Sequence, residues 1–505
     1  MNAALETTFA VAPPSADLSA LFRRVAALTP SLAQTSVAQR IAKVRRLMDT
    51  VLKYRTEIHE TGRLERGLTP PDMDGELVML KFEADFIARH LEDWMTPKVA
   101  PNSLMTLGKT CYVRYEPKGM ALVLPSWNAP YVIGLLPTMG AIAAGNAVIL
   151  KPSELSPHSS KLVARIVREA FPDGEVTVVE GGAEAAQGLL AQPFHHIFYI
   201  GNNHVGRIVM KAAADHFASV TLEMGGKNPS IVDASADIDD AALKTSWGRL
   251  CNAGQACIAP DYVLAHASVI DRFVATLVRE IKAMYDPRGE GFDKNPEYPR
   301  IINARHFERV KGLVEDARAK GATIVCGGTY DAAARYIAPT VITNVTDDMK
   351  LMQEEIFGPV IAVIPWRERG QVIDYIATRP KPLAAYVFAK DRDAIDYFIS
   401  RTTSGSLVVN HNVVQSGTNP LLPFGGVNSS GIGRMVGFAT FAECSNARAI
   451  VEEGPPVVEP RSMFPPLTAK YKKQLAQLIE GKPVPPWMVR LIDGIVRVVG
   501  LFKRG

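Results

Sequence analysis

The chain has 505 residues, of which 47% are apolar, and its mean hydropathy is near zero. These values are typical of a soluble globular protein with about two or three domains and exclude a largely disordered chain. The net charge is +4, but residues 467–505 carry eight Lys or Arg against two acids, so the basic excess lies in the tail. This argues against a nucleic-acid binder, which needs basic residues clustered on its folded body.

The cysteine content favours neither a disulfide framework nor a zinc site. There are five cysteines, an odd number without C-x-x-C spacing, and His195 and His196 have no acid or cysteine clustered beside them. Residues 1–19 lack the basic segment and continuous apolar stretch of a secretory signal. We therefore expect a cytoplasmic protein with no metal site.

The first hundred residues are predicted to be helical. Residues 36–60 repeat apolar side chains at three- and four-residue steps behind Ser36, a favourable N-cap. From Gly119 to Leu150 no charged residue appears, a length that could span a membrane. Prolines and glycines divide this run into strand, turn, helix, turn and strand, with the strands at 120–124 and 147–150. Such a pattern is typical of a buried βαβ unit.

Short β-rich runs then alternate with helical patterns. The alternation predicts an α/β fold with mostly parallel sheets and helices on both faces. A second α/β domain is expected to begin after Gly226. The predicted strands are VTVVEG, HIFYIG, SVTLEMGG, SIVD, DYVLAH, ATIVCGG, PTVIT and AAYVFA, and the helical patterns include SSKLVARIVREAF and VGRIVMKAAADH.

The segment KPSELSP, Lys151–Pro157, could bind the adenosine part of a dinucleotide. It follows a predicted strand directly, so the carboxylate of Glu154 could accept the two ribose hydroxyls and Lys151 could add a donor. The alternative is that Ser153 and Glu154 only start a helix.

The segment FYIGNNHVGRIV places two glycines between a predicted strand and a predicted helix. Gly201 and Gly206, separated by four residues, could let the backbone approach a pyrophosphate at the helix N-terminus. The spacing is not G-x-G-x-x-G, so a purely structural turn is an equal alternative.

Two further segments contain residue types that catalysis uses. LEMGGKNP places Glu223 at the end of a predicted strand beside two glycines, and GQACIAPDY places Cys257 between a small-residue turn and a proline. Each has an ordinary interpretation: the acid could be solvated or cap a helix, and the thiol could be buried and inert. Spacing alone does not join the two residues.

Six blocks in one order resemble the NAD(P)-dependent aldehyde dehydrogenase superfamily, over about residues 36–450. The short N-terminal part, APDYVL after the cysteine and PFGGVNSSG are similar to the class 3 branch, which includes fatty-aldehyde and bacterial coniferyl-aldehyde enzymes. The six blocks are PSWNAP, KPSELSP, LEMGGKNP, GQACIAPDY, QEEIFGP and PFGGVNSSGIGR.

The resemblance implies an aldehyde dehydrogenase-like fold with two parallel-sheet α/β domains plus a small β oligomerisation segment. We expect a dinucleotide-binding domain over residues 1–223, with a helical N-terminal part and a piece of the oligomerisation segment near 105–118. Residues 224–410 would form the catalytic domain. Residues 411–455 would return to the cofactor domain and the oligomerisation segment, and 456–505 would form a basic amphipathic tail.

The resemblance also implies catalytic roles for three residues. Cys257 would attack the aldehyde carbonyl, giving a thiohemiacetal and then a thioester. The side-chain amide of Asn128 and the backbone N–H of Cys257 would form an oxyanion hole. Glu223 would activate the water that hydrolyses the thioester.

The same resemblance implies a cofactor site for NAD, with NADP also allowed. Because a 2′-phosphate would face the charge of Glu154, NAD is favoured. The family usually has Gly-Ser where Gly201 is followed by Asn202, so one hydroxyl contact to phosphate is missing here. The residues expected to bind the cofactor are Trp127, Lys151, Ser153, Glu154, Gly201, Asn202, Gly206, Glu355 and Phe357.

The C-terminal tail is predicted to be an amphipathic helix. In PPWMVRLIDGIVRVVGLFKRG, Arg490, Asp493, Arg497 and Arg504 recur at helical spacing and leave a broad apolar face. Its internal charges make it a poor membrane span, but it suits a membrane interface, and the inner membrane face is the expected one. Burial against a partner subunit or over the substrate tunnel is the alternative.

The sequence therefore predicts an enzyme that oxidises a hydrophobic aldehyde, long-chain aliphatic or aromatic, to its carboxylic acid with NAD(P). A homodimer is expected from the family, with a small-molecule aldehyde as substrate. Two alternatives stay open: a CoA-acylating aldehyde dehydrogenase, against which Glu223 argues, and a non-catalytic structural or membrane-associated protein with the same fold.

Overall fold

The computed structural model describes residues 16–415, 419–453, 464–481 and 483–502. The chain divides into two compact units. The first unit is made of Met1–His90 and Pro117–Cys444, and the second of Leu91–Glu116 and Ser445–Gly505. The domain boundaries expected from the sequence stay a prediction.

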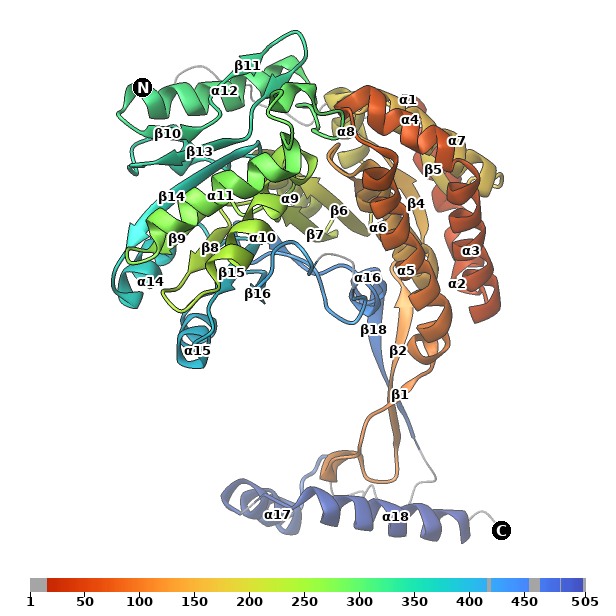
Figure 1. The fold of residues 1–505 in the computed structure, drawn as a ribbon. Coiled ribbons are helices and arrows are strands. Elements are labelled where there is room, and N and C mark those ends of the chain that lie inside the picture. The colour runs from red at the N-terminus through yellow and green to blue at the C-terminus, as the bar shows by residue number, and fades with distance from the viewer. Residues whose placement is uncertain (1–15, 416–418, 454–463, 482, 503–505) are drawn as a thin grey trace. The chain divides into compact units, whose positions relative to one another are not determined.

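The first unit contains a six-stranded sheet whose order is β17-β7-β6-β3-β4-β5. Figure 1 labels β4, β5, β6 and β7 of this sheet. Five of its strands are parallel, and β17 runs antiparallel to β7. The strands are β3 (Met120–Leu124), β4 (Ala147–Leu150), β5 (Val176–Val178), β6 (His196–Gly201), β7 (Ser219–Met224) and β17 (Gly431–Ile432).

The uncharged run after Gly119 forms β3, the helix α6 (Pro130–Ala144) and β4, as predicted. Pro130 starts α6 where its missing N–H costs nothing, and Gly145 ends it in the left-handed conformation (φ 91°). Both strands and nearly all of α6 are buried, which explains why the run carries no charge. It is therefore a core element and not a membrane span.

The chain reverses its direction across this sheet beside β3. From β3 it runs outward through β4 to β5, and then returns to the other side of β3 through β6 to β7. Ligands of open α/β sheets bind at such a switch point, outside the carboxyl ends of the strands. The predicted residues of PSWNAP and KPSELSP follow β3 and β4 at this edge, and Gly201 and Glu223 lie at or near the ends of β6 and β7.

Helices cover the first sheet, and an N-terminal group of helices packs on them. Ser36 caps α3 as predicted, within a capping box in which it exchanges hydrogen bonds with Gln39. α6 contacts β3 and β4, α7 contacts β5, and α9 contacts β6 and β7. The helices are α1 (Ala16–Ala26), α2 (Thr29–Ala33), α3 (Val37–Lys53), α4 (Arg55–Arg66), α5 (Pro70–Met95), α7 (Pro157–Ala170), α8 (Ala183–Leu190), α9 (Asn203–Asp215) and α16 (Phe438–Glu443).

A second, seven-stranded sheet of the same unit has the order β10-β13-β14-β9-β8-β15-β16. Only β10 is antiparallel to its neighbour. The strands are β8 (Pro229–Val232), β9 (Tyr262–His266), β10 (Thr323–Cys326), β13 (Thr340–Thr343), β14 (Val360–Trp366), β15 (Ala384–Phe388) and β16 (Ser406–Val409), and β11 (Tyr330–Asp331) pairs separately with β12 (Tyr336–Ile337).

This second sheet confirms the predicted second α/β layer after Gly226. Helices pack against its strands, and one apolar core fills the space between them. The helical elements are α10 (Ile238–Leu250), η2 (Cys251–Gly254), α11 (Ile270–Tyr285), η3 (Phe292–Lys294), α12 (Ala304–Ala319), α13 (Lys350–Gln353), α14 (Arg369–Ala377) and α15 (Arg392–Arg401).

The second unit combines a small sheet with the C-terminal helices. Its strand order is β1-β2-β18, so β18 is an edge strand among the described residues. No helix in the described part of the chain is long and apolar enough to cross a membrane. The elements are β1 (Lys98–Val99), η1 (Leu104–Thr106), β2 (Thr110–Pro117), β18 (Ser445–Glu452), α17 (Ala469–Glu480) and α18 (Pro486–Phe502).

Candidate active site

Glu223 lies near the end of β7, where it pairs with Gly431 of β17 and Ile200 of β6. Only 3% of Glu223 is exposed, and its Oε1 atom has no hydrogen-bond partner. Burial raises the pKa of this carboxyl to about 7, although a hydrogen bond with Cys257 opposes the shift. A carboxyl group with this pKa can exchange a proton at neutral pH.

Cys257 lies between η2 and β9, and its half-buried thiol is close enough to Glu223 for each group to shift the pKa of the other. Burial raises the pKa of the thiol well above its usual value, and the neighbouring charge of Glu223 raises it further. The folded chain therefore brings together the thiol and the carboxyl that the sequence left unconnected. The thiol needs a base before it can act as a nucleophile, and Glu223 is within reach.

Asn228 fixes the backbone around Cys257. Its side-chain amide donates to the carbonyl groups of Cys257 (2.7 Å) and Ala259 (3.0 Å), and its Oδ1 accepts the N–H of Ala384 (2.9 Å). Asn228 is 1% exposed, so these bonds form away from water. The cysteine loop is thereby attached to β15, which carries Ala384.

The turn before Cys257 has an unusual backbone that its sequence explains. Asn252, Ala253 and Gly254 all lie in the left-handed region, with φ of 52°, 51° and 73°. A Cβ at Gly254 would collide with the carbonyl oxygen of Gly358, so only glycine fits there. This close contact joins the cysteine turn to the QEEIFGP segment.

Glu355 of QEEIFGP follows α13, and its side chain lies beside Gly225, two residues after Glu223. Its carboxylate occupies the space that a Cβ on Gly225 would fill, and it accepts a backbone hydrogen bond from Gly226. Burial raises the pKa of Glu355 to about 8, and the charges of Asp261 and Glu223 add to this shift. The two glycines after Glu223 thus make room for the second acid.

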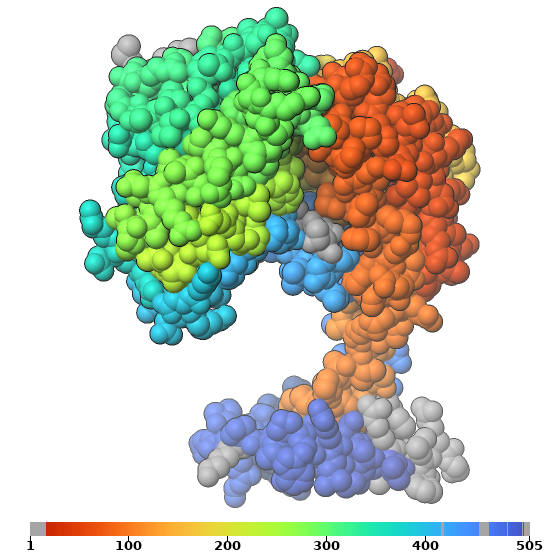
Figure 2. All heavy atoms as spheres, viewed as in Figure 1, coloured from red at the N-terminus to blue at the C-terminus, as the bar shows by residue number. Residues whose placement is uncertain are grey.

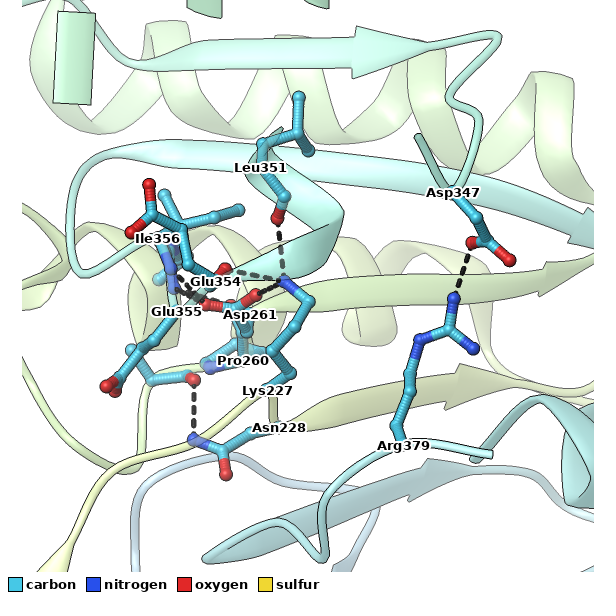
Figure 3. A network of polar contacts seen from close by, with 12 residues as sticks. Lys227, Asn228, Pro260, Asp261, Asp347, Leu351, Glu354, Glu355, Ile356 and Arg379 are labelled. Atoms are coloured by element: carbon cyan, nitrogen blue, oxygen red, sulfur yellow. Dashed lines mark hydrogen bonds and ion pairs between the residues drawn. The ribbon is translucent and has the colours of Figure 1, made fainter. Parts of the chain in front are cut away.

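A buried ion pair holds these segments together (Figure 3). The ammonium of Lys227 donates to Asp261 Oδ1 and to the carbonyl groups of Leu351 (2.7 Å) and Glu354 (3.2 Å). Asp261 Oδ2 accepts the N–H of Ile356 (2.9 Å). Lys227 and Asp261 are 8% and 1% exposed, respectively. The pair therefore connects LEMGGKNP, GQACIAPDY and QEEIFGP at one point.

Asn128 follows β3 and is linked to the cysteine turn through its backbone. Its carbonyl oxygen accepts hydrogen bonds from the guanidinium of Arg66 and from the Asn252 amide (3.0 Å). The preceding Trp127 packs edge-on against Phe357, with ring centroids 5.6 Å apart. The residues predicted on PSWNAP and QEEIFGP therefore lie close to one another.

Lys151, Ser153 and Glu154 lie between β4 and α7. Lys151 is buried and its ammonium donates to the exposed Glu154 carboxylate at 2.7 Å. Partial burial opposes it, but this bond keeps the pKa of Glu154 below its usual value. The Ser153 hydroxyl accepts the N–H of Leu155 (3.3 Å), a local turn contact. Glu154 is therefore ionised and open to solvent at this edge of the sheet.

Gly201, Asn202 and Gly206 lie where β6 leads into α9. The Asn202 side chain caps α9 by accepting the Val205 N–H (3.0 Å). A Cβ at Gly206 would collide with Met224 at the end of β7. Asn202 thus caps α9, and the serine that the family usually has at this position could do the same. Gly206 permits close packing of α9 against the sheet.

These residues fit a dinucleotide. Three features lie beyond the carboxyl ends of parallel strands at the switch point. They are the start of α9, the ionised Glu154, and the space beside Gly225 that Glu355 fills. In the described ranges, no group of three or more His, Cys, Asp or Glu is placed to hold a metal ion.

Sequence reasoning missed four residues that shape this site. Lys227 and Asn228 stand in LEMGGKNP, Asp261 stands in GQACIAPDY, and Asn252 stands in the small-residue turn before it. Each is a polar residue inside an otherwise apolar or glycine-rich block. That pattern could have marked them as buried and hydrogen-bonded, because a buried polar group needs partners.

Comparisons with known proteins point to one family. A profile described as "Aldehyde dehydrogenase family" matches residues 9–450. Aldehyde dehydrogenase family 3 member A2 of Macaca fascicularis is 43% identical over 74% of this chain and 75% of its own length. The dimeric NADP-preferring aldehyde dehydrogenase of Canis lupus familiaris is 39% identical, over 78% and 85%. The substrate-bound structure of Staphylococcus aureus AldH has a TM-score of 0.86 and 33% identity, and the match covers 91% of this chain and 99% of that one.

Proposed function

Because the chain belongs to the aldehyde dehydrogenase family, and is therefore an NAD(P)-dependent enzyme that oxidises aldehydes, we propose that Cys257 is its nucleophile and Glu223 its general base. The observation that carries this proposal is the close approach of the half-buried Cys257 thiol and the buried Glu223 carboxyl, which shift each other's pKa. The ion pair of Lys227 and Asp261 supports it by joining the segments on both sides.

The first step needs a thiolate. Glu223 accepts the proton of Cys257, and the sulfur then forms a bond to the aldehyde carbon while the carbonyl electrons move to its oxygen. The side-chain amide of Asn128 and the N–H of Cys257 are proposed to stabilise that oxyanion. The backbone contacts at Asn128 and Asn228 support this arrangement because they fix both groups.

The proposed cofactor residues would hold NAD(P), which would supply the oxidising power as a hydride acceptor, and the oxidised substrate would remain on Cys257 as a thioester. Glu223 releases the thiol proton to solvent, and the regenerated carboxylate then takes a proton from water, whose oxygen attacks the thioester carbon. The sulfur leaves with the bonding electrons, and the carboxylic acid is released. Glu223 thus serves both half-reactions from one position.

For the cofactor, we propose that Lys151, Ser153 and Glu154 bind the adenosine end, with Gly201, Asn202 and Gly206 near the pyrophosphate. Trp127, Glu355 and Phe357 would contact the nicotinamide end. The ionised, exposed Glu154 favours NAD, because a 2′-phosphate would approach a negative charge.

A hydrophobic aldehyde is the proposed substrate. The helix α10 leads directly into the Cys257 turn and exposes Leu243 and Trp247, which lie on one face four residues apart. Trp247 also packs edge-on against His411, with ring centroids 6.0 Å apart. These apolar side chains support a long-chain or aromatic substrate, as the class 3 resemblance implies.

The second unit supports a homodimer. The edge strand β18 leaves its backbone available for pairing, and its side chains are largely exposed. We propose that a second copy of the chain covers this edge.

The apolar face of α18 is proposed to lie on a membrane surface, which would place the cytoplasmic enzyme at the inner face of the membrane. Asp493 anchors the opposite face by accepting hydrogen bonds from Asn102 and Gly108 (2.9 Å each). Trp487, Leu491, Ile495 and Val498 form an exposed stripe at helical spacing on α18. The space-filling view of Figure 2 draws the C-terminal helices in blue. Lys470, Lys472 and Lys473 of α17 supply positive charge for anionic lipid.

Cys257→Ser should abolish aldehyde oxidation, because a hydroxyl is a far weaker nucleophile than a thiolate. The expected result is no NADH burst and no turnover, with NAD affinity within about two-fold of wild type. Stopped-flow absorbance and calorimetry measure both. Cys251→Ser, six residues earlier, is the matched control and should keep the burst. Turnover by Cys257→Ser would remove Cys257 as nucleophile.

Turnover should fall as pH drops through about 7, the pKa of Glu223. The base acts only when ionised, so a raised pKa means that activity is present above pH 7 and declines about tenfold per pH unit well below it. Glu223→Gln should stop turnover at every pH. A kcat profile that is flat from pH 5.5 to 8 in the wild-type enzyme would contradict the role of Glu223.

Replacing Trp487, Leu491 and Ile495 by Ser should abolish sedimentation with vesicles that contain anionic lipid, because the apolar stripe is lost while the Asp493 anchor stays. Phe217→Ser, which removes an exposed apolar residue of the first unit, is the control and should leave sedimentation unchanged. If the triple variant still sediments, or if it changes only the oligomer size in light scattering, the membrane proposal is wrong.

A further inference from the structure

The side chain of Arg66, the last residue of α4, is buried beside the catalytic loops. Arg66 is 0% exposed, and Gly67 ends the helix after it in the left-handed conformation (φ 66°). The carbonyl group of Arg66 accepts the N–H of Arg300 at 2.7 Å. The backbone at this position is therefore held from both sides, which fixes where the guanidinium can reach.

The guanidinium touches both loops of the proposed oxyanion site. Its Nη1 donates to the backbone carbonyl of Asn128 and to Asn252 Oδ1 at 3.3 Å. Asn252 in turn donates its amide to the same Asn128 carbonyl and to the carbonyl of Gln255, both at 3.0 Å. The Asn128 carbonyl thus accepts hydrogen bonds from two side chains, Arg66 of α4 and Asn252 of the cysteine turn.

Gln255 extends this connection to within two residues of Cys257. Its side-chain amide donates to the carbonyl groups of Asn252 (2.9 Å) and Arg300 (3.1 Å). Its Oε1 atom accepts the N–H of Ile302 (3.0 Å). Arg300 is the residue whose N–H binds the Arg66 carbonyl. The contacts therefore form a closed ring from α4 to the cysteine turn and back.

A purely stabilising role does not explain why Arg66 is buried at this position. Its Nε and Nη2 atoms have no hydrogen-bond partner, and the nearest carboxylate oxygen, on Glu76, is 4.0 Å away. Glu76 is itself engaged with the N–H groups of Tyr131 and Val132 at the start of α6 (3.0 Å each). A buried cation with two unused donors costs free energy. What it supplies is a fixed direction for the Asn128 carbonyl.

We propose that Arg66 is a positioning residue for aldehyde oxidation: it holds the Asn128 carbonyl and the Asn252 side chain so that the Asn128 amide faces the oxygen of the carbonyl group attacked by Cys257. This proposal rests on the proposed roles of Asn128 and Cys257. Arg66 acts through Asn128 and the turn before Cys257, and it touches no reacting atom itself.

The expected loss of rate on replacing Arg66 follows from geometry. A misplacement of about 1 Å in a reacting group can lower the rate roughly a hundred-fold. Arg66→Met keeps the stem length but removes the donors, so the rate constant of the NADH burst should fall roughly ten- to a hundred-fold. Arg66→Lys offers an ammonium on a shorter side chain, which keeps donors but reaches the two acceptors of Nη1 less well, so its rate constant should fall between.

Stopped-flow measurement of the NADH burst separates positioning from folding. If Arg66 positions the loops, the burst amplitude per mole of total enzyme stays near one while its rate constant falls. If Arg66 only stabilises the fold, the amplitude falls and the rate constant stays at the wild-type value, which would overturn the proposal. Arg63→Met is the matched control: Arg63 is exposed one turn earlier and pairs with Glu60 at 2.6 Å.

A second readout needs no aldehyde turnover. Alkylation of Cys257 by iodoacetamide, followed by peptide mass spectrometry, reports the geometry of the cysteine turn directly. Arg66→Met should change the alkylation rate at least about three-fold relative to wild type, because the turn loses its α4 contact, whereas Arg63→Met should not. Equal rates in all three proteins would overturn the positioning role. A wild-type enzyme that oxidised no aldehyde would instead refute the proposed function.

Discussion

The buried ion pair of Lys227 and Asp261 is the interaction on which the site depends. Removing one partner of such a pair typically costs about 3–5 kcal/mol, because the other charge is left buried and uncompensated. Here the two charges also bind the carbonyl of Leu351 and the N–H of Ile356, so the segment that carries Glu355 cannot move away from the segments that carry Glu223 and Cys257 without breaking those bonds. One polar contact inside an apolar core thereby sets the positions of three chemical groups.

Burial then determines the protonation of those groups. Loss of water raises the pKa of Glu223 to about 7 and of Glu355 to about 8, and it raises the pKa of the Cys257 thiol as well. Near neutral pH the Cys257 thiol is therefore protonated, while the two carboxyls lie close to the pH at which they ionise. The same burial that makes the thiol reluctant to ionise gives its neighbour the basicity to accept the proton. Packing and reactivity thus have one physical cause.

Much of the fold could be predicted from local patterns. The strands at 120–124, 147–150 and 196–201 agree residue by residue, because glycine, proline and charge mark the ends of buried apolar runs. The antiparallel pairing of β17 with β7 could not be predicted, since two residues carry no periodicity. The contacts of Asn228 with the Cys257 loop and of Arg66 with Asn128 were also missed, because they join residues far apart in sequence. The resemblance supplied the catalytic residues, and only the structure supplied what holds them.

The central claim is that Cys257 carries the substrate as a thioester and that Glu223 is the base needed to form and to hydrolyse it. The most direct measurement is peptide mass spectrometry of the wild-type enzyme, quenched in acid during its first turnover with a medium-chain aldehyde and NAD, beside the Glu223→Gln variant. The account predicts an acyl group on the wild-type peptide that contains Cys257 and none on that peptide in the variant. An unmodified Cys257 in the wild-type enzyme, an acyl group on another cysteine, or equal acylation of the variant would contradict it.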